Sequence, residues 1–223
     1  MVIKKETQNP AKLRARSDAD KTARRQQLLS AAAELHTERD LNWTMLEVAG
    51  RAGLAKGTTY LYFRTKEELL LELLTEELEA WFTELNAQLN LSPAHSSRHS
   101  IRDDLAVTVS QSIVSRPRLV ALIAVQASIL EQNLSFEAAL RFKSFWLERS
   151  SQIAPHLEKL LPGSPGIEIL QWINALVIGL AQLGQPAARL KPILERPEMQ
   201  PLRVNFQSAL ERSLRALFRG LEP

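Results

Sequence analysis

The chain has 223 residues, 45% of them hydrophobic and 24% charged, which is enough for one large globular domain or for two smaller ones. It contains no cysteine, which excludes disulfides, thiolate metal sites and a cysteine nucleophile, and we expect a cytoplasmic protein. The net charge of +3 is unevenly spread, because residues 1–66 hold 13 Lys or Arg against 7 Asp or Glu, whereas the remainder holds 15 against 18.

The basic N-terminal third favours a polyanion as the partner of that end, with a solvated basic tail as the alternative. Residues 1–20 are polar and lack an apolar run, so we expect a disordered basic arm rather than a secretory signal peptide. The arm could follow phosphates or enter a minor groove, or it could serve only as a tether. Its cations outside the first helix are Lys4, Lys5, Lys12, Arg14 and Arg16.

Almost every later segment is predicted to be helical, because short alternating runs rich in Val, Ile and Thr are nearly absent. The first helix is expected over residues 21–36. The second begins at Thr44, where Thr44 and Glu47 fit a capping box, and it ends at Gly53. Next comes a short third helix over residues 56–63.

The stretch AGLAKGTTYLYF at residues 52–63 predicts a helix-turn-helix, in which two short helices are joined by a tight turn and the second lies in the DNA major groove. Gly53 allows the turn, and Gly57 lets the backbone of the recognition helix approach DNA closely. Lys56 and Thr58 are the expected base readers, the lysine through guanine acceptors and the threonine through a thymine methyl. A helical hairpin with core aromatics is the alternative.

Phosphate contacts are expected around the same helix. Tyr60 and Tyr62 can present hydroxyls to phosphates, while Leu54 and Phe63 face inward. A second capping box at residues 65–68 opens a long fourth helix that runs to about residue 89. We expect Lys66 and the amides at the start of this helix to bind a phosphate.

This segment closely resembles the DNA-binding domain of TetR-family transcriptional regulators over about residues 22–72. The matching positions are Thr44, Val48, Ala49, Ala52, Gly53, Leu54, Gly57, Thr58, Tyr60, Tyr62, Phe63, Lys66, Glu67, Glu68 and Leu69. The resemblance implies an all-α homodimer with a helix-turn-helix domain at residues 21–66 and a ligand-binding and dimerisation domain at residues 67–223. Carried over by position, it implies DNA contacts from Thr44, Lys56, Gly57, Thr58, Tyr60, Tyr62 and Lys66.

Two positions depart from the family pattern. Asp40 stands where the family usually has glycine, although aspartate tolerates a left-handed turn better than most residues. Thr59 stands where the family usually has a larger aliphatic residue, so we expect different packing under the recognition helix.

The C-terminal two-thirds is predicted to contain a Ser/His-rich linker at residues 92–100 and helices near 101–115, 117–132 and 136–161. Pro155 should kink or weaken the last of these. After a break at residues 161–166, an apolar helix runs from Pro165 to Leu183, an irregular segment covers 185–201, and an amphipathic helix covers 202–218.

The last two helices are the predicted dimer surface. The helix at 165–183 is apolar almost all round, so we expect burial by its own domain and by a partner, with burial inside one subunit as the alternative and no membrane span. Ala175 and Gly179 would permit close helix approach. The predicted interface consists of Trp172, Ala175, Leu176, Gly179, Leu183, Phe206, Leu210 and Leu214.

An effector pocket is expected among the helices between residues 78 and 180. Pockets are mostly apolar with a few polar groups, so a small hydrophobic or aromatic effector is expected, although plain core packing is the favoured interpretation of each residue taken singly. The candidates are Phe82, Gln126, Arg141, Phe142, Phe145, Trp146, His156 and Trp172.

The function expected from these features is a repressor that binds a palindromic operator as a homodimer and is released by its effector. One alternative is an effector-independent or architectural DNA-binding protein with a solid C-terminal core. A helical enzyme is a more distant one, because the four histidines are scattered and neither a nucleophile elbow nor a phosphate loop is present. We expect no cofactor or metal.

Overall fold

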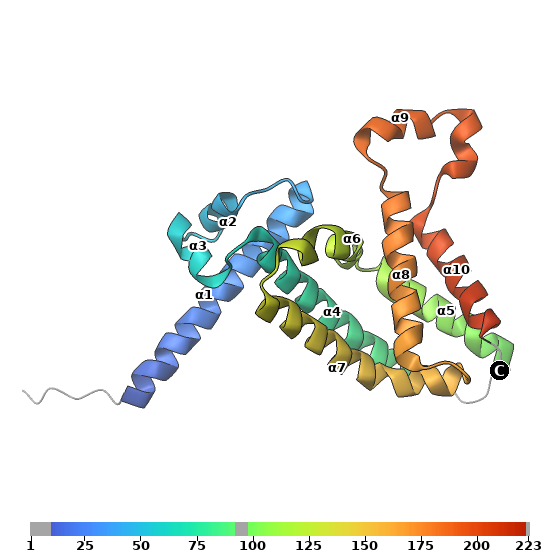
Figure 1. Cartoon of the computed structure of the whole chain (residues 1–223), viewed down its shortest axis with the longest axis horizontal. Helices are drawn as coiled ribbons and strands as arrows, with labels where there is room; N and C mark the ends of the chain where they lie inside the picture. The colour runs from blue at the N-terminus through green and yellow to red at the C-terminus, as the bar shows by residue number, and fades with distance from the viewer. Residues whose placement is uncertain (1–9, 92–97, 222–223) are drawn as a thin grey trace, which may run out of the picture. The chain divides into compact units, whose positions relative to one another are not determined.

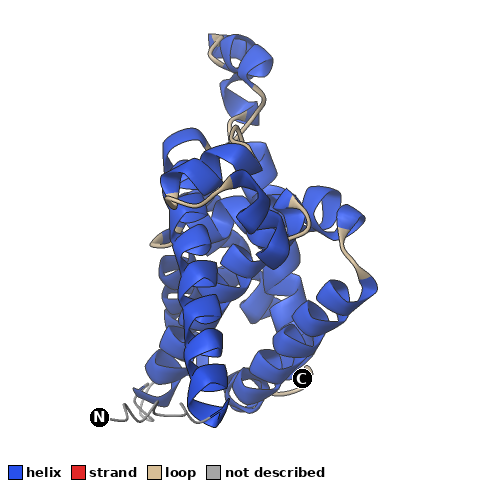
Figure 2. Cartoon of the chain, turned by 90° about the vertical axis from the view of Figure 1, so that its left-hand side faces the viewer, coloured by secondary structure: helices blue, strands red, loops and turns tan. Residues whose placement is uncertain are grey.

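The computed structural model describes residues 10–91 and 98–221, and every regular element in that part of the chain is a helix (Figure 2). The all-α fold class is confirmed. The contacts divide the chain into two compact units, residues 1–69 and 70–223, so the division lies three residues beyond the boundary expected at 66.

The first unit contains α1 (Pro10–Arg39), α2 (Met45–Arg51), α3 (Lys56–Tyr62) and the start of α4 (Lys66–Leu91) (Figure 1). Its buried apolar side chains come from α1, α2, the start of α4 and the loops between the helices, and they include Leu28, Leu35, Trp43, Val48, Phe63 and Leu69. α1 begins eleven residues before the start expected at Lys21. The helix therefore includes half of the arm that was expected to be disordered, and residues 1–9 of that arm lie outside the described part.

The longer α1 has a simple physical basis. Residues 11–16 read AKLRAR, which are strong helix formers, and Pro10 is tolerated in a first turn because its missing amide hydrogen would have no partner there. The polarity of residues 10–20 led to the expectation of disorder, but polarity does not oppose a helix that continues from a buried segment.

The second unit is a bundle of five long helices and one shorter one. Together with α4 it contains α5 (Arg98–Val114), α6 (Pro117–Val125), α7 (Phe136–Leu160), α8 (Gly166–Gly184) and α10 (Phe206–Gly220). α8 packs on α6, α7 and α10, and α10 packs on α5. Short π and 3-10 segments, Gln126–Leu130 and Glu131–Asn133, link α6 to α7, where the sequence had predicted a helix continuing to residue 132.

α7 continues through Pro155 to Leu160, so the expected weakening does not end the helix. Pro155 lies on the exposed side of α7, where water can solvate the carbonyl that loses its amide partner. The end of α7 is tied to α8, because the Gly166 amide donates to the Glu158 carboxylate at 2.8 Å.

α8 buries only one side within its own unit. Ile169, Leu170, Ile173, Val177 and Ala181 are buried, whereas Trp172 and Leu176 are half-buried. Ala175, Gly179 and Leu183 lie on the exposed side. By length and composition α8 could cross a membrane, but a core helix of a water-soluble bundle passes the same test.

α10 corrects part of the predicted dimer surface. Leu210, Leu214 and Phe218 are fully buried within the subunit, where α10 packs against α5 and α8, and Phe206 is half-buried. Leu210 and Leu214 are therefore not available to a partner. An amphipathic pattern identifies a face that must be covered, but it does not distinguish coverage by the same chain from coverage by another.

The segment between α8 and α10 is not simply irregular. It contains two 3-10 turns, Ala188–Leu190 and Pro197–Leu202, and the single-turn helix α9 (Lys191–Leu194). In Figures 1 and 2 it extends beyond the ends of α8 and α10.

Candidate nucleic-acid interface

The turn between α2 and α3 is built by Gly53. Its φ of +68° lies in the left-handed region, which glycine adopts at little cost. The Gly53 amide donates to the Gly50 carbonyl at 3.2 Å and the Leu54 amide donates to the Ala49 carbonyl at 2.9 Å. These two bonds form a Schellman motif, which satisfies the last carbonyls of α2. The helix end expected at Gly53 is confirmed.

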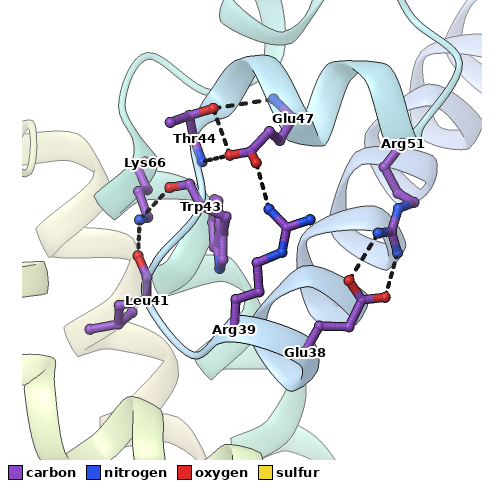
Figure 3. A network of polar contacts seen from close by, with 8 residues as sticks. All are labelled: Glu38, Arg39, Leu41, Trp43, Thr44, Glu47, Arg51 and Lys66. Atoms are coloured by element: carbon purple, nitrogen blue, oxygen red, sulfur yellow. Dashed lines mark hydrogen bonds and ion pairs between the residues drawn. The ribbon is translucent and has the colours of Figure 1, made fainter. Parts of the chain in front are cut away.

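The start of α2 carries the expected capping box (Figure 3). The Thr44 hydroxyl accepts from the Glu47 amide at 3.3 Å, and the Thr44 amide donates to the Glu47 carboxylate at 2.8 Å. The Thr44 amide and hydroxyl hold the pKa of Glu47 below its usual range, and desolvation opposes them only in part. Arg39 also donates to Glu47 at 2.6 Å, which ties the end of α1 to α2.

Thr44→Ala should lower the free energy of opening α2 by about 0.5–2 kcal/mol, because the helix loses its N-cap. Amide hydrogen exchange at residues 45–51 measures this opening. Thr37→Ala is the matched control, since Thr37 is an exposed threonine inside α1 that caps nothing. Equal exchange rates in Thr44→Ala and the parent would contradict the capping role.

One face of α3 is open. Gly57, Tyr60 and Leu61 share this face at helical spacing, and Tyr60 is 48% and Leu61 82% exposed. Thr59 and the following Phe63 are buried on the opposite side, with 0% and 3% of their surface exposed. The remaining candidates flank the open face: Lys56 is exposed, and Thr58 and Tyr62 are half-buried.

Four cations near α2 and α3 fall into two groups. Arg51 donates to Glu38 at 2.9 and 3.0 Å, and Arg39 is paired with Glu47 (Figure 3). Arg51 also donates to Glu34 at 3.1 Å. Lys56 and Arg64, in contrast, are exposed and form no ion pair with any residue that the structure describes. They stand just before and just after the open face of α3, which leaves two uncommitted positive charges beside it.

Lys66 has a different environment from the one expected. Its ammonium group donates to the carbonyl of Leu41 and, at 2.7 Å, to that of Trp43, and it lies 4.3 Å from the centre of the Trp43 ring (Figure 3). Partial burial lowers the pKa of Lys66, although the carboxylates of Glu67, Glu47 and Asp40 act in the opposite direction.

This geometry argues against the phosphate contact expected for Lys66. An ammonium has three N–H donors, and two carbonyls and a ring face occupy them. The first turn of α4 also carries Glu67 and Glu68, which repel a phosphate. Glu68 accepts from the Arg64 amide at 3.0 Å, and its own amide donates to the Thr65 hydroxyl at 3.1 Å. Lys66 instead holds the loop between α1 and α2.

Both departures from the family pattern have structural counterparts. Asp40 adopts a φ of +56°, the left-handed conformation expected there, and its carbonyl lies 3.0 Å from Nδ1 of the buried His36. Thr59 is fully buried, and its hydroxyl has no hydrogen-bond partner among the described residues. Leu54 is only half-buried, whereas Phe63 packs inward as expected.

The second unit contains a small cavity of about 20 Å³, lined by α4, α5, α6, α7 and α8. The Asn174 side chain forms no hydrogen bond with the residues that the structure describes, whereas the indole nitrogen of Trp81 donates to the Ser112 hydroxyl at 3.0 Å. The lining residues are Leu78, Trp81, Ile113, Leu119, Ile123, Trp146, Leu170, Ile173, Asn174 and Val177.

Of the eight effector-binding candidates from the sequence, Trp146 lines this pocket. Phe82 and Phe142 are buried core residues, and Gln126 donates to Glu131 at 2.8 Å. Arg141 is exposed on α7. Three further candidates are half-buried outside the lining: Phe145, His156 and Trp172. Helical spacing identified the apolar faces, but not which of them border a void.

Residues 28–73 match the family model described as bacterial regulatory proteins of the tetR family, and residues 75–223 match the tetracyclin repressor-like C-terminal domain. The second match covers more than half of the chain. The chain belongs to the TetR family. TetR-family proteins are DNA-binding transcriptional regulators, so the helix-turn-helix is the DNA-binding element, and an enzyme is not the correct interpretation.

Individual relatives are distant. The HTH-type transcriptional regulator RutR of Escherichia coli O157:H7 is 26% identical in an alignment 223 positions long. The alignment covers 97% of this chain and 99% of RutR. The fatty acid metabolism regulator protein of Bacillus subtilis strain 168 is 25% identical over 111 residues, which cover 48% of this chain and about half, 54%, of that relative.

Solved structures agree on the TetR fold. A putative TetR-family regulator from Syntrophomonas wolfei has a TM-score of 0.55 at 15% identity, with 90% of this chain and 95% of that chain covered. The fatty acid degradation regulator FadR of Bacillus halodurans has a TM-score of 0.54 at 16% identity, with 88% and 95% covered. At such identities these likenesses concern the fold alone.

Sequence reasoning missed one residue on the recognition helix of this TetR-family chain and one just beyond its end. Arg64 follows the aromatic cluster and was not considered, although its position just beyond α3 could have drawn attention to it. Leu61 stands between two tyrosines and has the side chain of a core residue, yet 82% of its surface is exposed.

Proposed function

We propose that this regulator is a repressor that binds a palindromic operator as a homodimer and is released by a small, uncharged, apolar effector. The observation that carries the proposal is the open face of α3, with Gly57, Tyr60 and Leu61 uncovered and the free cations Lys56 and Arg64 beside it. A helix that is buried on one side and open beside positive charges suits the major groove. We propose a cytoplasmic location with it, because the protein must reach DNA.

The position of each residue around α3 suggests whether it contacts a base or a phosphate. Lys56, at the leading end of α3, is the base reader that can donate to guanine, with Thr58 next to it. Tyr60, Tyr62 and Arg64 contact phosphates. Thr44 is exposed at the start of α2, and its hydroxyl serves the capping box at the same time.

Homodimer formation is supported by the outer side of α8. Ala175, Gly179 and Leu183 are exposed there beside the half-buried Trp172 and Leu176, although the helix is strongly apolar. Such a surface is typical of an interface core, whereas α10 contributes less than expected because its leucines are buried within the subunit. Two identical DNA-binding domains related by two-fold symmetry require an operator with the same symmetry.

The effector class follows from the pocket lining. Apart from Asn174, every lining residue is aliphatic or a tryptophan, so a charged ligand would lose its hydration with no opposite charge in the lining. We therefore infer an uncharged molecule that is mostly hydrocarbon or aromatic, with one hydrogen-bonding group near Asn174. The apolar lining is compatible with this sensor function, and the cavity must widen to admit an effector, because its space of about 20 Å³ holds about one water molecule.

The operator can be selected from random duplexes with the full-length protein and then titrated with salt. Arg64→Ala should reduce the slope of log K against log salt by about 0.9 for each phosphate that the variant no longer binds. Lys56→Ala should instead relax the preference at one position of each half-site, at a cost of about 1–3 kcal/mol. Lys66→Met should leave the slope unchanged, because its ammonium group binds the protein.

Lys159→Ala is the matched control, because Lys159 is an exposed lysine near the end of α7 in the other unit. If Lys56→Ala and Arg64→Ala both retain the parent's affinity, slope and base preference, the assigned DNA face is refuted. For the effector, uncharged apolar compounds should raise the melting temperature, and stabilisation by charged compounds alone would refute the effector class.

A further inference from the structure

Leu61 stands out on the recognition helix. It is 82% exposed, and no large hydrophobic side chain in the described part of the chain is more so. Single exposed leucines are common on protein surfaces. This one, however, lies on the face of α3 that the proposed function turns toward DNA, together with Gly57 and Tyr60.

The neighbours of Leu61 leave it uncovered. Gly57, one helical turn earlier, has no side chain, and a β-carbon built there would meet nothing within 4 Å. The core lies on the opposite side of the helix, where Thr59 and Phe63 are buried. Leu61 therefore has no packing role in the fold of the described residues, and the space beside it at Gly57 admits a close approach by another molecule.

The major groove offers a leucine one favourable partner. Guanine, adenine and cytosine present mainly hydrogen-bonding groups along their major-groove edges, whereas thymine adds a 5-methyl group that makes apolar contacts. A leucine pressed against the polar edges would remove water from donors and acceptors without replacing their hydrogen bonds. The favourable arrangement places the leucine side chain on a thymine methyl.

We propose that Leu61 is a specificity residue that recognises the 5-methyl group of one thymine in each half-site. The proposal rests on the proposed function, because it requires α3 to lie in the major groove. It goes further in one respect: the sequence assigned base reading to Lys56 and Thr58, and Leu61 adds an apolar reader on the exposed face itself. Burying one methyl group corresponds to about a fourfold change in affinity for each half-site.

The test removes the methyl group from the DNA and the side chain from the protein. In the selected operator, each symmetry-related pair of thymines is replaced in turn by deoxyuridine, which lacks only the 5-methyl group. The parent protein should lose about fourfold in affinity per half-site at one such position. Leu61→Ala should bind the unmodified operator more weakly and should show no further loss at that position, as a double-mutant cycle requires for two groups in contact.

Leu147→Ala is the matched control, since Leu147 is an exposed leucine on α7, and it should reproduce the parent's deoxyuridine profile. Circular dichroism checks that Leu61→Ala remains folded. The proposal is overturned if Leu61→Ala and the parent have the same deoxyuridine profile, or if no thymine is sensitive in the parent. Failure to select any operator would instead refute the proposed function, so the two failures are distinguishable.

Discussion

Gly179→Arg should yield folded, helical monomers whose operator affinity is lower by orders of magnitude. Gly179 is exposed on α8, and a β-carbon built there meets nothing within 4 Å, so its own subunit accommodates the new side chain. In a close crossing with a partner helix, an arginine would be buried without a counter-charge, which costs about 3–5 kcal/mol. The single DNA-binding domain of a monomer then contacts too few base pairs to select one site in a genome.

Sedimentation of Gly179→Arg measures the oligomeric state, and titration with the selected operator measures the affinity. Ser144→Arg carries the same charge to an exposed position of α7 and should remain a dimer with normal affinity. A Gly179→Arg protein that sediments as a dimer and binds normally would show that α8 does not meet its partner at this residue.

Gly166→Val should destabilise the second unit by about 3 kcal/mol, near the upper end of the usual cost of overpacking. A β-carbon at Gly166 would lie 2.3 Å from the carbonyl oxygen and 2.5 Å from the α-carbon of Ala154. Both atoms belong to the backbone of α7, so no side-chain rotation relieves the contact. α7 and α8 must therefore move apart where they cross.

Thermal unfolding of Gly166→Val should show a melting temperature lower by roughly 6–12 °C, given the usual 2–4 °C per kcal/mol for a domain of this size. Gly220→Ala is the control, because a β-carbon at Gly220 meets nothing within 4 Å. An unchanged melting temperature in Gly166→Val would mean that α7 and α8 do not cross as closely as the structure has them.

Local features of the helix-turn-helix could be predicted from the sequence because their partners are near in the chain. The Thr44 and Glu47 capping box joins residues three apart, and the turn at Gly53 is closed by amides and carbonyls of residues 49–54. Such geometry depends on residue type and spacing, which the sequence displays directly.

Features that depend on distant partners could not be predicted. The carbonyls that bind Lys66 belong to Leu41 and Trp43, which lie 25 and 23 residues earlier in the chain. From the sequence alone, a lysine at the start of a helix is equally consistent with a phosphate ligand. The same holds for Leu210 and Leu214. Their apolar spacing indicates that they are buried, but it does not indicate whether the same subunit or a partner buries them. Leu61 shows the converse, an apolar residue that its position leaves uncovered.

We propose that two copies of the α3 face recognise a symmetric DNA site. The most direct measurement is the symmetry of the duplex selected by the full-length protein, together with the mass of the complex on that duplex. We predict two inverted half-sites, with centres about one helical turn or a multiple of it apart, and one two-fold dimer spanning each pair of half-sites. An asymmetric site occupied by a single protomer, or no enriched sequence, would contradict recognition by a two-fold dimer.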